Sequence, residues 1–549
     1  MMLCEAARPG AERNMMDRPI TTEVSTLGDL LFRAAAVAPE RDALVLPSQR
    51  ATYSAMRDGA VRVARSLTAL GVRRGEHVGL LIPNCVEFAE AILGVALLGC
   101  VAVPLNARHK ATELGYIIRN ADLVAILTSR HPDDPVDFPA VLASGLEGEP
   151  APHLEHIVLV RGSAGQGVMD VSAFQALADH IEPSVIEIRR RQVRVRDAAL
   201  IIYTSGTTAN PKGCVLSHEA VTRGPVERAR YRLKAADHDV VWGAGPLFHI
   251  GTFAPFVGTL GVAGTFLTDG YFEAGRALQL MYDEKVTLTW PWFPAIMQGL
   301  IGHPSFDPAK LASMRHLCII APPAQVDLVQ TLLPSCEVIQ GCGMTETAGV
   351  FALSDPDEDR VSRSTTNGKA SPGIEIRIVD PETGTDLPDG TLGEIWVRGY
   401  NVMEGYWAAP EKTAEALTSD GWLKTGDLYT RLPGGSLVFG GRYKDMLKVG
   451  GENVAAVEIE AFLATHPAVK TVEVVGRFDI RLDEVPVAFV EIHPGHEIDE
   501  DGLIAHCRGR IASYKVPRAI IFLAASDWPM SATKIDKRAL RDRLKELAS

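Results

Sequence analysis

A short loop of small hydroxyl residues, glycine and one lysine could bind phosphate. It reads Tyr-Thr-Ser-Gly-Thr-Thr-Ala-Asn-Pro-Lys-Gly from Tyr203 to Gly213, directly after the apolar run from Ala198 to Ile202. Backbone N–H and hydroxyl groups in such a loop can donate hydrogen bonds to phosphate oxygens, and Lys212 adds a positive charge. The loop therefore predicts a polyphosphate site, although a Ser/Thr/Gly loop taken alone is more often a solvated turn.

The loop differs from the Walker A pattern of P-loop proteins. That pattern requires a second glycine five residues after the first, followed by Lys and then Ser or Thr. Pro211 and Gly213 occupy the relevant places here. This difference argues against the P-loop motor and kinase classes.

Further motifs follow the loop in a fixed order along the chain, and together they span most of it. They are QGCGMTE at 340–346, TGDL at 425–428, GRYKDMLKVGGEN at 441–453, YKVPR at 514–518 and MSATKI at 530–535. With the phosphate loop, they resemble the signature motifs of the adenylate-forming superfamily. This superfamily contains acyl-CoA synthetases, luciferases and the adenylation domains of peptide synthetases.

The resemblance implies a site for ATP and Mg²⁺. Thr345 and Glu346 would meet phosphate and Mg²⁺, for which a carboxylate is a suitable hard oxygen ligand. Asp427 would accept hydrogen bonds from both ribose hydroxyls, and Arg442 would approach the same ribose. Taken singly, such residues are more often solvated acids or members of surface ion pairs. The residues implied to bind the nucleotide are Thr204, Ser205, Gly206, Thr207, Thr208, Lys212, Gly341, Cys342, Gly343, Met344, Thr345, Asp427 and Arg442.

Lys534 is implied in the first chemical step. A substrate carboxylate is already ionised at neutral pH and needs no general base, so the obstacle is the approach of two anions. A lysine ammonium that bridges the carboxylate and the α-phosphate would lower this barrier. Lys534, Glu346 and Lys212 are therefore the expected catalytic residues, together with His249. His249 would position and gate the substrate, although a lone histidine after an apolar run is more often a core residue.

The resemblance also implies coenzyme A as the second substrate. The segment from Lys448 to Asn453 would close over the thiol, because its glycines let backbone approach a narrow pantetheine arm. An ordinary hairpin turn is the alternative. The residues implied at this site are Lys448, Gly450, Gly451 and Glu452.

Several positions depart from the superfamily pattern. Ala209 stands where Gly is usual, Cys342 replaces the aromatic residue that stacks on adenine, and Ala532-Thr533 replaces Thr-Gly before the lysine. The run from Pro322 to Gln325 replaces a Gly-Ala-Ala-Pro type loop. Loss of the aromatic stack removes about 0.5–1.5 kcal/mol of binding free energy, which weakens ATP binding without abolishing chemistry.

An acyl-CoA ligase is the expected function: a carboxylic acid is converted by MgATP to acyl-AMP and pyrophosphate, and CoA then takes the acyl group. An adenylation enzyme that loads a carrier protein is an alternative, although no carrier domain follows the last motif before Ser549. A non-catalytic nucleotide or acyl-adenylate binder is another alternative, and nothing beyond the shared fold supports a luciferase-like oxidase.

The acid itself is left open by the sequence. A group of bulky residues, in a region that lines the acyl pocket in relatives, favours a short, cyclic or branched acid over a long straight chain. The same residues could equally be core packing. They are Trp290, Trp292, Phe293 and Met297.

The elements that position these residues alternate between helical and strand-like patterns. Helices are predicted at 53–70, where Gly71 ends the run, and at 111–120; strands are predicted at 77–82, 101–104 and 123–128. Such alternation predicts an α/β fold, with a large lobe of helix-covered mixed sheets. Short strands with turn signals beyond Ile374 predict a small antiparallel unit. A glycine pair at Gly440-Gly441 precedes a small α+β domain that is expected to be mobile.

The domains expected are a disordered extension at 1–22, an AMP-binding domain at 23–440 and a mobile C-terminal domain at 441–549. Within the last, helices are predicted at 457–464 and 498–510, and strands at 469–475, 487–492 and 520–523. Two or more folded units suit a chain of 549 residues.

Composition excludes several classes of protein and partner. Hydrophobic residues make up 46% and charged residues 22%, which excludes collagen-like and disordered chains. The net charge of −13 argues against a nucleic-acid partner. The longest apolar run, from Ala91 to Leu105, is too short for a membrane span. The 8 cysteines have no CxxC spacing, so a reducing, cytoplasmic location is expected. The oligomeric state is left open, with a homodimer as one option.

Overall fold

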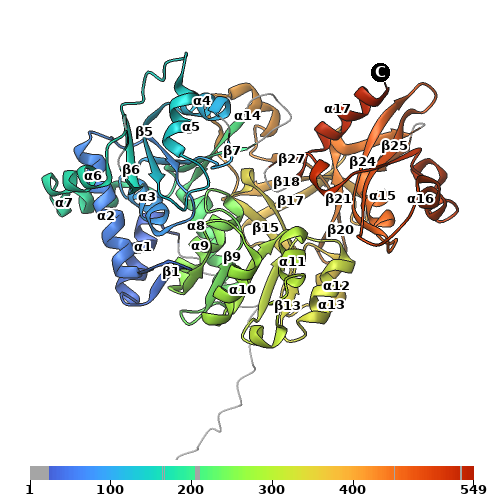
Figure 1. Ribbon diagram of the computed structural model, residues 1–549, viewed down its shortest axis with the longest axis horizontal. Helices are drawn as coiled ribbons and strands as arrows, with labels where there is room; N and C mark the ends of the chain where they lie inside the picture. The colour runs from blue at the N-terminus through green and yellow to red at the C-terminus, as the bar shows by residue number, and fades with distance from the viewer. Residues whose placement is uncertain are drawn as a thin grey trace, which may run out of the picture.

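The computed structural model describes residues 24–109, 111–163, 165, 167–204, 211–449, 452–531 and 534–548. The expected N-terminal extension at 1–22 lies outside this part of the chain. The α/β architecture predicted from the sequence is confirmed, with a large lobe of mixed sheets, small antiparallel sheets and a separate C-terminal unit (Figure 1).

The first large sheet contains the strand that leads into the phosphate loop. Its order is β19-β8-β7-β4-β3-β5-β6. β7 is parallel to β4, whereas β8 turns back antiparallel to β7. The apolar run in β7 is buried, as expected for a strand covered by helices. The strands are β3 (His77–Leu81), β4 (Val101–Pro104), β5 (Leu123–Arg130), β6 (His156–Gly162), β7 (Ala198–Thr204), β8 (Lys212–Ser217) and β19 (Gly405–Tyr406).

The second large sheet has the order β13-β12-β11-β9-β10-β1-β2. Its neighbouring strands are parallel except for the pair β1 and β2. The strands are β1 (Asp42–Leu46), β2 (Gln49–Thr52), β9 (Val240–Gly243), β10 (Thr265–Leu267), β11 (Leu288–Trp292), β12 (His316–Ile319) and β13 (Glu337–Ile339).

A helix pair lies between the two large sheets and carries much of the main core. α8 contacts β7 and β8 of the first sheet, and α9 contacts β9 and β10 of the second (Figure 1). The two helices approach closely at Gly258, where an added Cβ would meet the Pro225 carbonyl oxygen at 2.9 Å. The helices of the lobe are α1 (Leu27–Val37), α2 (Tyr53–Ala69), α3 (Val86–Leu97), α4 (Ala111–Asn120), α5 (Phe138–Leu146), α6 (Val171–Leu177), α7 (Pro183–Gln192), α8 (His218–Glu227), α9 (Ile250–Val262), α10 (Ala274–Asp283), α11 (Pro294–Ile301), α12 (Pro323–Leu332), α13 (Arg360–Thr365) and α14 (Pro410–Ala416).

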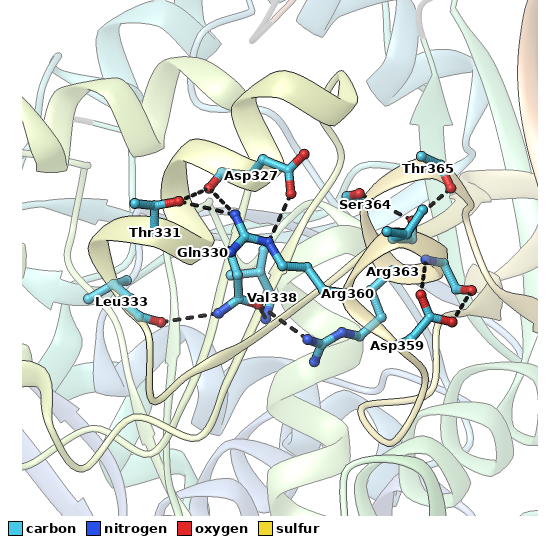
Figure 2. Close-up of polar contacts among 12 residues, drawn as sticks. Asp327, Gln330, Thr331, Leu333, Val338, Asp359, Arg360, Arg363, Ser364 and Thr365 are labelled. Atoms are coloured by element: carbon cyan, nitrogen blue, oxygen red, sulfur yellow. Dashed lines mark hydrogen bonds and ion pairs between the residues drawn. The ribbon is translucent and has the colours of Figure 1, made fainter.

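Polar contacts between α12, α13 and β13 fix the strand that precedes the QGCGMTE motif (Figure 2). Arg360 on α13 donates to Asp327 Oδ1 at 3.1 Å and to Thr331 Oγ1 at 3.1 Å on α12. Gln330 Oε1 accepts a hydrogen bond from the Val338 N–H at 3.1 Å. Because β13 ends at Ile339, these contacts set where the motif begins.

Two small antiparallel sheets follow, and the second of them is the antiparallel unit predicted beyond Ile374. The sheet β14-β15-β16 carries the QGCGMTE motif, and the sheet β17-β18-β20-β21 carries the TGDL motif. The strands are β14 (Gly341–Met344), β15 (Gly349–Leu353), β16 (Lys369–Ala370), β17 (Ile374–Val379), β18 (Leu392–Gly399), β20 (Leu423–Arg431) and β21 (Leu437–Arg442).

The C-terminal unit is an α+β assembly with its own core (Figure 1). Its sheet has the order β23-β22-β25-β24, with β26 parallel to β25. Its elements are β22 (Met446–Val449), β23 (Glu452–Ala455), α15 (Ala456–Leu463), β24 (Val469–Asp479), β25 (Asp483–Ile492), α16 (Glu500–Cys507), β26 (Ala519–Phe522), β27 (Met530–Ser531), β28 (Lys534–Ile535) and α17 (Lys537–Ala548).

Two further observations concern the chain as described. Each cysteine that the structure describes is a buried free thiol. None of the described helices is long and apolar enough to cross a membrane.

Candidate active site

The phosphate-loop strands meet at Lys212, which lies against an aromatic ring. β7 and β8 pair Thr204 with Lys212, so the loop leaves and re-enters the sheet at one place. The Lys212 Nζ lies 4.2 Å from the centroid of the Tyr406 ring, a cation–π contact. The predicted residues Ser205, Gly206, Thr207 and Thr208, and the departure at Ala209, lie outside the described residues.

Tyr406 connects Lys212 to Glu346, and sequence reasoning missed it. Its hydroxyl donates to Glu346 Oε1 at 2.8 Å. Burial raises the pKa of Tyr406, and the Glu346 carboxylate raises it further, so the hydroxyl stays protonated and can donate. The contact depends on the pairing of β19 with β8, which places Tyr406 opposite Cys214. No spacing in the sequence signals this pairing.

Glu346 is 8% exposed and belongs to a short 3₁₀ turn. A hydrogen bond to the backbone carbonyl of Glu346 anchors this turn. The Met403 N–H donates to the Glu346 carbonyl oxygen at 2.9 Å. The turn ends at Ala348, whose φ of 50° is a left-handed conformation that a non-glycine residue rarely adopts. Thr345 belongs to the same turn.

Asp427 and Arg442 face each other across β20 and β21. The two residues are directly paired in the strand register, and Arg442 Nε lies 3.2 Å from Asp427 Oδ1. Burial raises the pKa of Asp427, and Glu346 acts in the same direction, whereas Arg442 and Lys534 oppose the shift. The charges of both Glu346 and Lys534 therefore act on the Asp427 carboxylate.

Lys534 reaches this group from the C-terminal unit. The strand pair β27–β28 lies on the side of that unit that faces the large lobe (Figure 1). Desolvation and the Arg442 charge lower the pKa of Lys534, and Asp427 raises it. Lys534 Nζ lies 5.8 Å from the centroid of the Phe293 ring, which belongs to the large lobe.

His249 precedes α9 and is half-buried. Desolvation lowers its pKa to about 4, and the positive charges of Arg108 and Lys534 contribute. His249 is therefore a neutral imidazole at pH 7. Its backbone carbonyl accepts the Phe253 N–H at 3.0 Å, so the His249 backbone is fixed at the first turn of α9.

The strand of the QGCGMTE motif has no aromatic ring at position 342 that could stack on adenine. The Cys342 side chain is 3% exposed and packs in the core beside Phe351 and Tyr429. At Gly343, an added Cβ would meet the Gly349 carbonyl oxygen at 2.2 Å, so this position requires glycine. Gly341 and Met344 begin and end the same strand.

The segment implied for coenzyme A is a hairpin of the C-terminal unit. Lys448 is in β22 and Glu452 is in β23, and these strands pair antiparallel. Gly450 and Gly451 lie outside the described residues. The preceding glycine pair, Gly440-Gly441, lies inside β21, which continues to Arg442.

A narrow apolar cavity of about 30 Å³ lies beside these residues. Trp290 and Trp292 line it, whereas Met297 packs in the core of the second sheet. The predicted aromatic cluster therefore divides between cavity wall and core. The lining includes Ile250, which follows His249 in the chain, and Trp292, which precedes Phe293, the residue whose ring lies 5.8 Å from Lys534 Nζ.

The described side chains could bind Mg²⁺ together with substrate phosphates, but they do not form a metal site by themselves. In the portion of the chain that the structure describes, no three His, Cys, Asp or Glu side chains form a metal site. One carboxylate together with substrate phosphate oxygens is an ordinary set of Mg²⁺ ligands, so Glu346 fits this use.

Comparisons with known proteins agree with this geometry. A family model described as "AMP-binding enzyme" matches residues 31–407, and one described as "AMP-binding enzyme C-terminal domain" matches residues 458–534. The 3-[(3aS,4S,7aS)-7a-methyl-1,5-dioxo-octahydro-1H-inden-4-yl]propanoyl:CoA ligase of Rhodococcus jostii (strain RHA1) is 32% identical over 542 residues, covering 96% of this chain and 100% of its own.

Two solved structures share the fold over nearly the full chain. The anthranilate CoA ligase AuaEII, in complex with anthranoyl-AMP, has a TM-score of 0.84 and 27% identity, covering 98% of this chain and 100% of its own. ATP-bound MatB from Rhodopseudomonas palustris has a TM-score of 0.83 and 27% identity, covering 96% of this chain and 100% of its own. The chain therefore belongs to the AMP-binding family of adenylate-forming enzymes.

Proposed function

We propose that this enzyme is an acyl-CoA ligase that joins a carboxylic acid to coenzyme A in two steps at one site. The observation that carries the proposal is the pairing of Asp427 with Arg442 in the large lobe at 3.2 Å, together with Lys534 of the C-terminal unit, whose Nζ lies 5.8 Å from the Phe293 ring of that lobe and whose pKa responds to both charges. These charges come from segments far apart in the sequence and match the needs of a nucleotide and a carboxylate.

In the first step, a carboxylate oxygen of the acid attacks the α-phosphorus of ATP. The bond between the α-phosphorus and the bridging oxygen breaks, and pyrophosphate leaves with that electron pair. Lys534 would stabilise the charge shared by the attacking oxygen and the α-phosphate. Asp427 would hold the ribose hydroxyls, with Arg442 beside it.

Glu346 would hold Mg²⁺ together with the phosphate oxygens, and the bound ion would offset the charge of the leaving pyrophosphate. The Tyr406 hydrogen bond keeps Glu346 Oε1 directed, and Lys212 beside the same ring would contact phosphate. Thr204, Thr345 and the loop residues would add hydrogen-bond donors.

In the second step, the sulfur of CoA attacks the acyl carbon, and the carbon–oxygen bond to AMP breaks. The thiol proton passes to solvent. His249 is neutral at pH 7 and would line the passage between acid and thiol. The C-terminal domain would rotate so that the hairpin of Lys448 and Glu452 replaces Lys534 at the site.

The acyl group would lie against the aromatic wall of the apolar cavity. This wall suits a cyclic or branched acid, and two relatives act on ring acids by their names, a methyl-dioxo-octahydroindenyl propanoate and anthranilate. A cytoplasmic location is part of the proposal, because buried free thiols suit a reducing compartment.

A panel of carboxylic acids, assayed for AMP release with and without CoA, tests the proposal. We expect release that requires the acid, ATP and CoA together. Acid-dependent pyrophosphate exchange without CoA-dependent AMP release would indicate an adenylation enzyme that serves a carrier protein. The absence of both reactions across the panel would indicate a non-catalytic binder.

A further inference from the structure

Arg228 brings a charged group into the otherwise apolar cavity. Of the described residues that line the cavity, Arg228 alone carries a charge. The residue is 6% exposed, and it is the first residue of a π-helical turn, Arg228–Arg232, that follows α8. Turns of this type are rare and occur frequently at functional sites.

The Arg228 guanidinium has more donors than the protein satisfies. Its Nη1 donates to the Val350 carbonyl oxygen at 2.7 Å. A guanidinium carries five N–H donors, and Arg228 makes no other side-chain hydrogen bond with the residues that the structure describes. Burial lowers the pKa of Arg228 to about 10, so the group remains charged at pH 7. An oxygen acceptor on a ligand in the cavity would therefore find N–H groups of Arg228 that the protein leaves free to donate.

The charge of Arg228 has a nearby counterpart in the protein. Glu227 is 3% exposed and accepts a hydrogen bond from the Tyr400 hydroxyl at 3.4 Å. Its negative charge acts on Arg228 against the effect of burial. A ligand therefore needs to supply an acceptor atom and not a second negative charge, which favours a neutral carbonyl oxygen.

The cavity is lined both by Arg228 and by Ile250, which follows His249 in the chain. It follows one face of α9, with lining residues at helical spacing from Ile250 to Thr259. Pro255 has no N–H to donate to Gly251, and Trp292 Nε1 donates to that carbonyl oxygen at 2.6 Å instead. Trp292 is thus a fixed wall, held at a φ of 61° that a bulky residue rarely adopts.

We infer that Arg228 donates a hydrogen bond to a carbonyl oxygen at the far end of the acid substrate, and that the enzyme selects oxo acids over matched acids without this oxygen. This inference rests on the proposed ligase function. A site built to bond a polar atom discriminates against a ligand without it more strongly than an apolar pocket discriminates by shape.

The test compares pairs of carboxylic acids that differ by one ketone, with the ketone moved along the chain or around a ring. For the best-placed ketone, we expect wild-type kcat/KM for CoA-dependent AMP release to exceed that of the matched deoxo acid by about 10–100-fold. In Arg228→Met this ratio should fall to about 1, mainly through loss of activity on the oxo acid.

Arg232→Met is the matched control. Arg232 lies in the same π-helical turn and donates to the Leu353 carbonyl oxygen at 2.8 Å, but it is not among the lining residues. This variant should keep the wild-type ratio. If Arg228→Met does not fold, Arg228→Lys, which keeps a charge but has a shorter reach and fewer donors, should lower the ratio at least 3-fold.

Three results would overturn the inference while leaving the ligase function intact. One is activity on deoxo acids equal to that on every oxo partner. Another is an equal loss of the ratio in the Arg228 and Arg232 variants. The third is a preference for a second carboxylate over the ketone, which would mean that Arg228 pairs with a charge. Failure of all acids to react would contradict the ligase function itself.

Discussion

Glu346 and Lys212 share a single partner, the Tyr406 side chain. The ring lies under the Lys212 ammonium, and the hydroxyl donates to the Glu346 carboxylate. One residue thus aligns a cation and an anion whose proposed ligands, phosphate and Mg²⁺, have opposite charges. Because Tyr406 is a hydrogen-bond donor and not a charge, it can position Glu346 without neutralising it.

Replacing Glu346 by Gln should lower kcat/KM for acid-dependent pyrophosphate exchange by about 100-fold, because the amide is a poor Mg²⁺ ligand. Titration with MgCl₂ gives the diagnostic readout, since the variant should need more Mg²⁺ to reach half of its maximal rate. Tyr406→Phe keeps the carboxylate and should lose about 3–10-fold. A Glu346→Gln enzyme with wild-type Mg²⁺ dependence would refute the assignment.

Residues within ordered motifs could be predicted from the sequence, because each motif combines several residue types at fixed spacing. Glu346, Asp427, Arg442 and Lys534 were found in this way, although their roles remain predictions. Tyr406 could not be found, because it joins the site through strand pairing between distant segments. Cys342 was expected at the adenine, but its side chain faces the core.

At the scale of elements, His218 links α8 to α1. It is fully buried, and its Nδ1 accepts the Leu27 N–H at 3.3 Å. Burial lowers the pKa of His218 to about 4, and the Asp197 charge opposes this only in part. The folded protein therefore holds this histidine neutral at pH values where an unfolded chain would protonate it.

The free energy of unfolding should decrease as the pH falls from about 6.5 to about 4, because in this window the unfolded chain binds a proton that the folded chain does not. Above pH 6.5 the contribution is fully present. His218→Asn keeps an acceptor for Leu27, and it should reduce the loss at pH 4 by about 2 kcal/mol, as measured by urea unfolding at several pH values. His238→Asn is the control, because His238 is exposed. Identical pH profiles for wild type and His218→Asn would contradict this account.

Strands β14 and β15 approach too closely at Gly343 to admit a side chain. Gly343→Ala would force the Gly349 carbonyl oxygen away and shift the backbone next to Glu346. We expect the KM for ATP to rise about 10-fold or more and the unfolding free energy to fall by about 1–3 kcal/mol. Gly270→Ala is the control, since its Cβ would come no closer than 3.7 Å to any neighbour. Unchanged ATP binding in Gly343→Ala would show that this backbone is not part of the nucleotide site.

The bounds of elements with a clear hydrophobic period could be predicted to within two residues. These elements include α2, β3, β4, α4 and β5. The ends of strands and helices that are set by tertiary pairing could not be predicted in this way. β21 runs through Gly440-Gly441 because Gly441 pairs with Leu428 on β20. α16 ends at Cys507, short of the predicted Arg510, because the Arg508 φ and ψ are extended.

At the scale of the whole molecule, the site is divided between two units. The large lobe supplies Glu346, Asp427 and Arg442, and the C-terminal unit supplies Lys534, whose pKa responds to both Arg442 and Asp427. This arrangement suits the first step of the proposed reaction. A later rotation would withdraw Lys534, so its removal should affect the two steps differently.

The most direct test of the account is the rate of each half-reaction in Lys534→Ala. Acyl-AMP formation, measured by pyrophosphate exchange, should fall by about 100-fold or more, while thioester formation from supplied acyl-AMP and CoA should stay within about 3-fold of wild type. Lys545→Ala, a surface change in α17, should alter neither rate. Acyl-AMP formation within about 10-fold of wild type in Lys534→Ala would contradict the claim that this ammonium brings the two anions together.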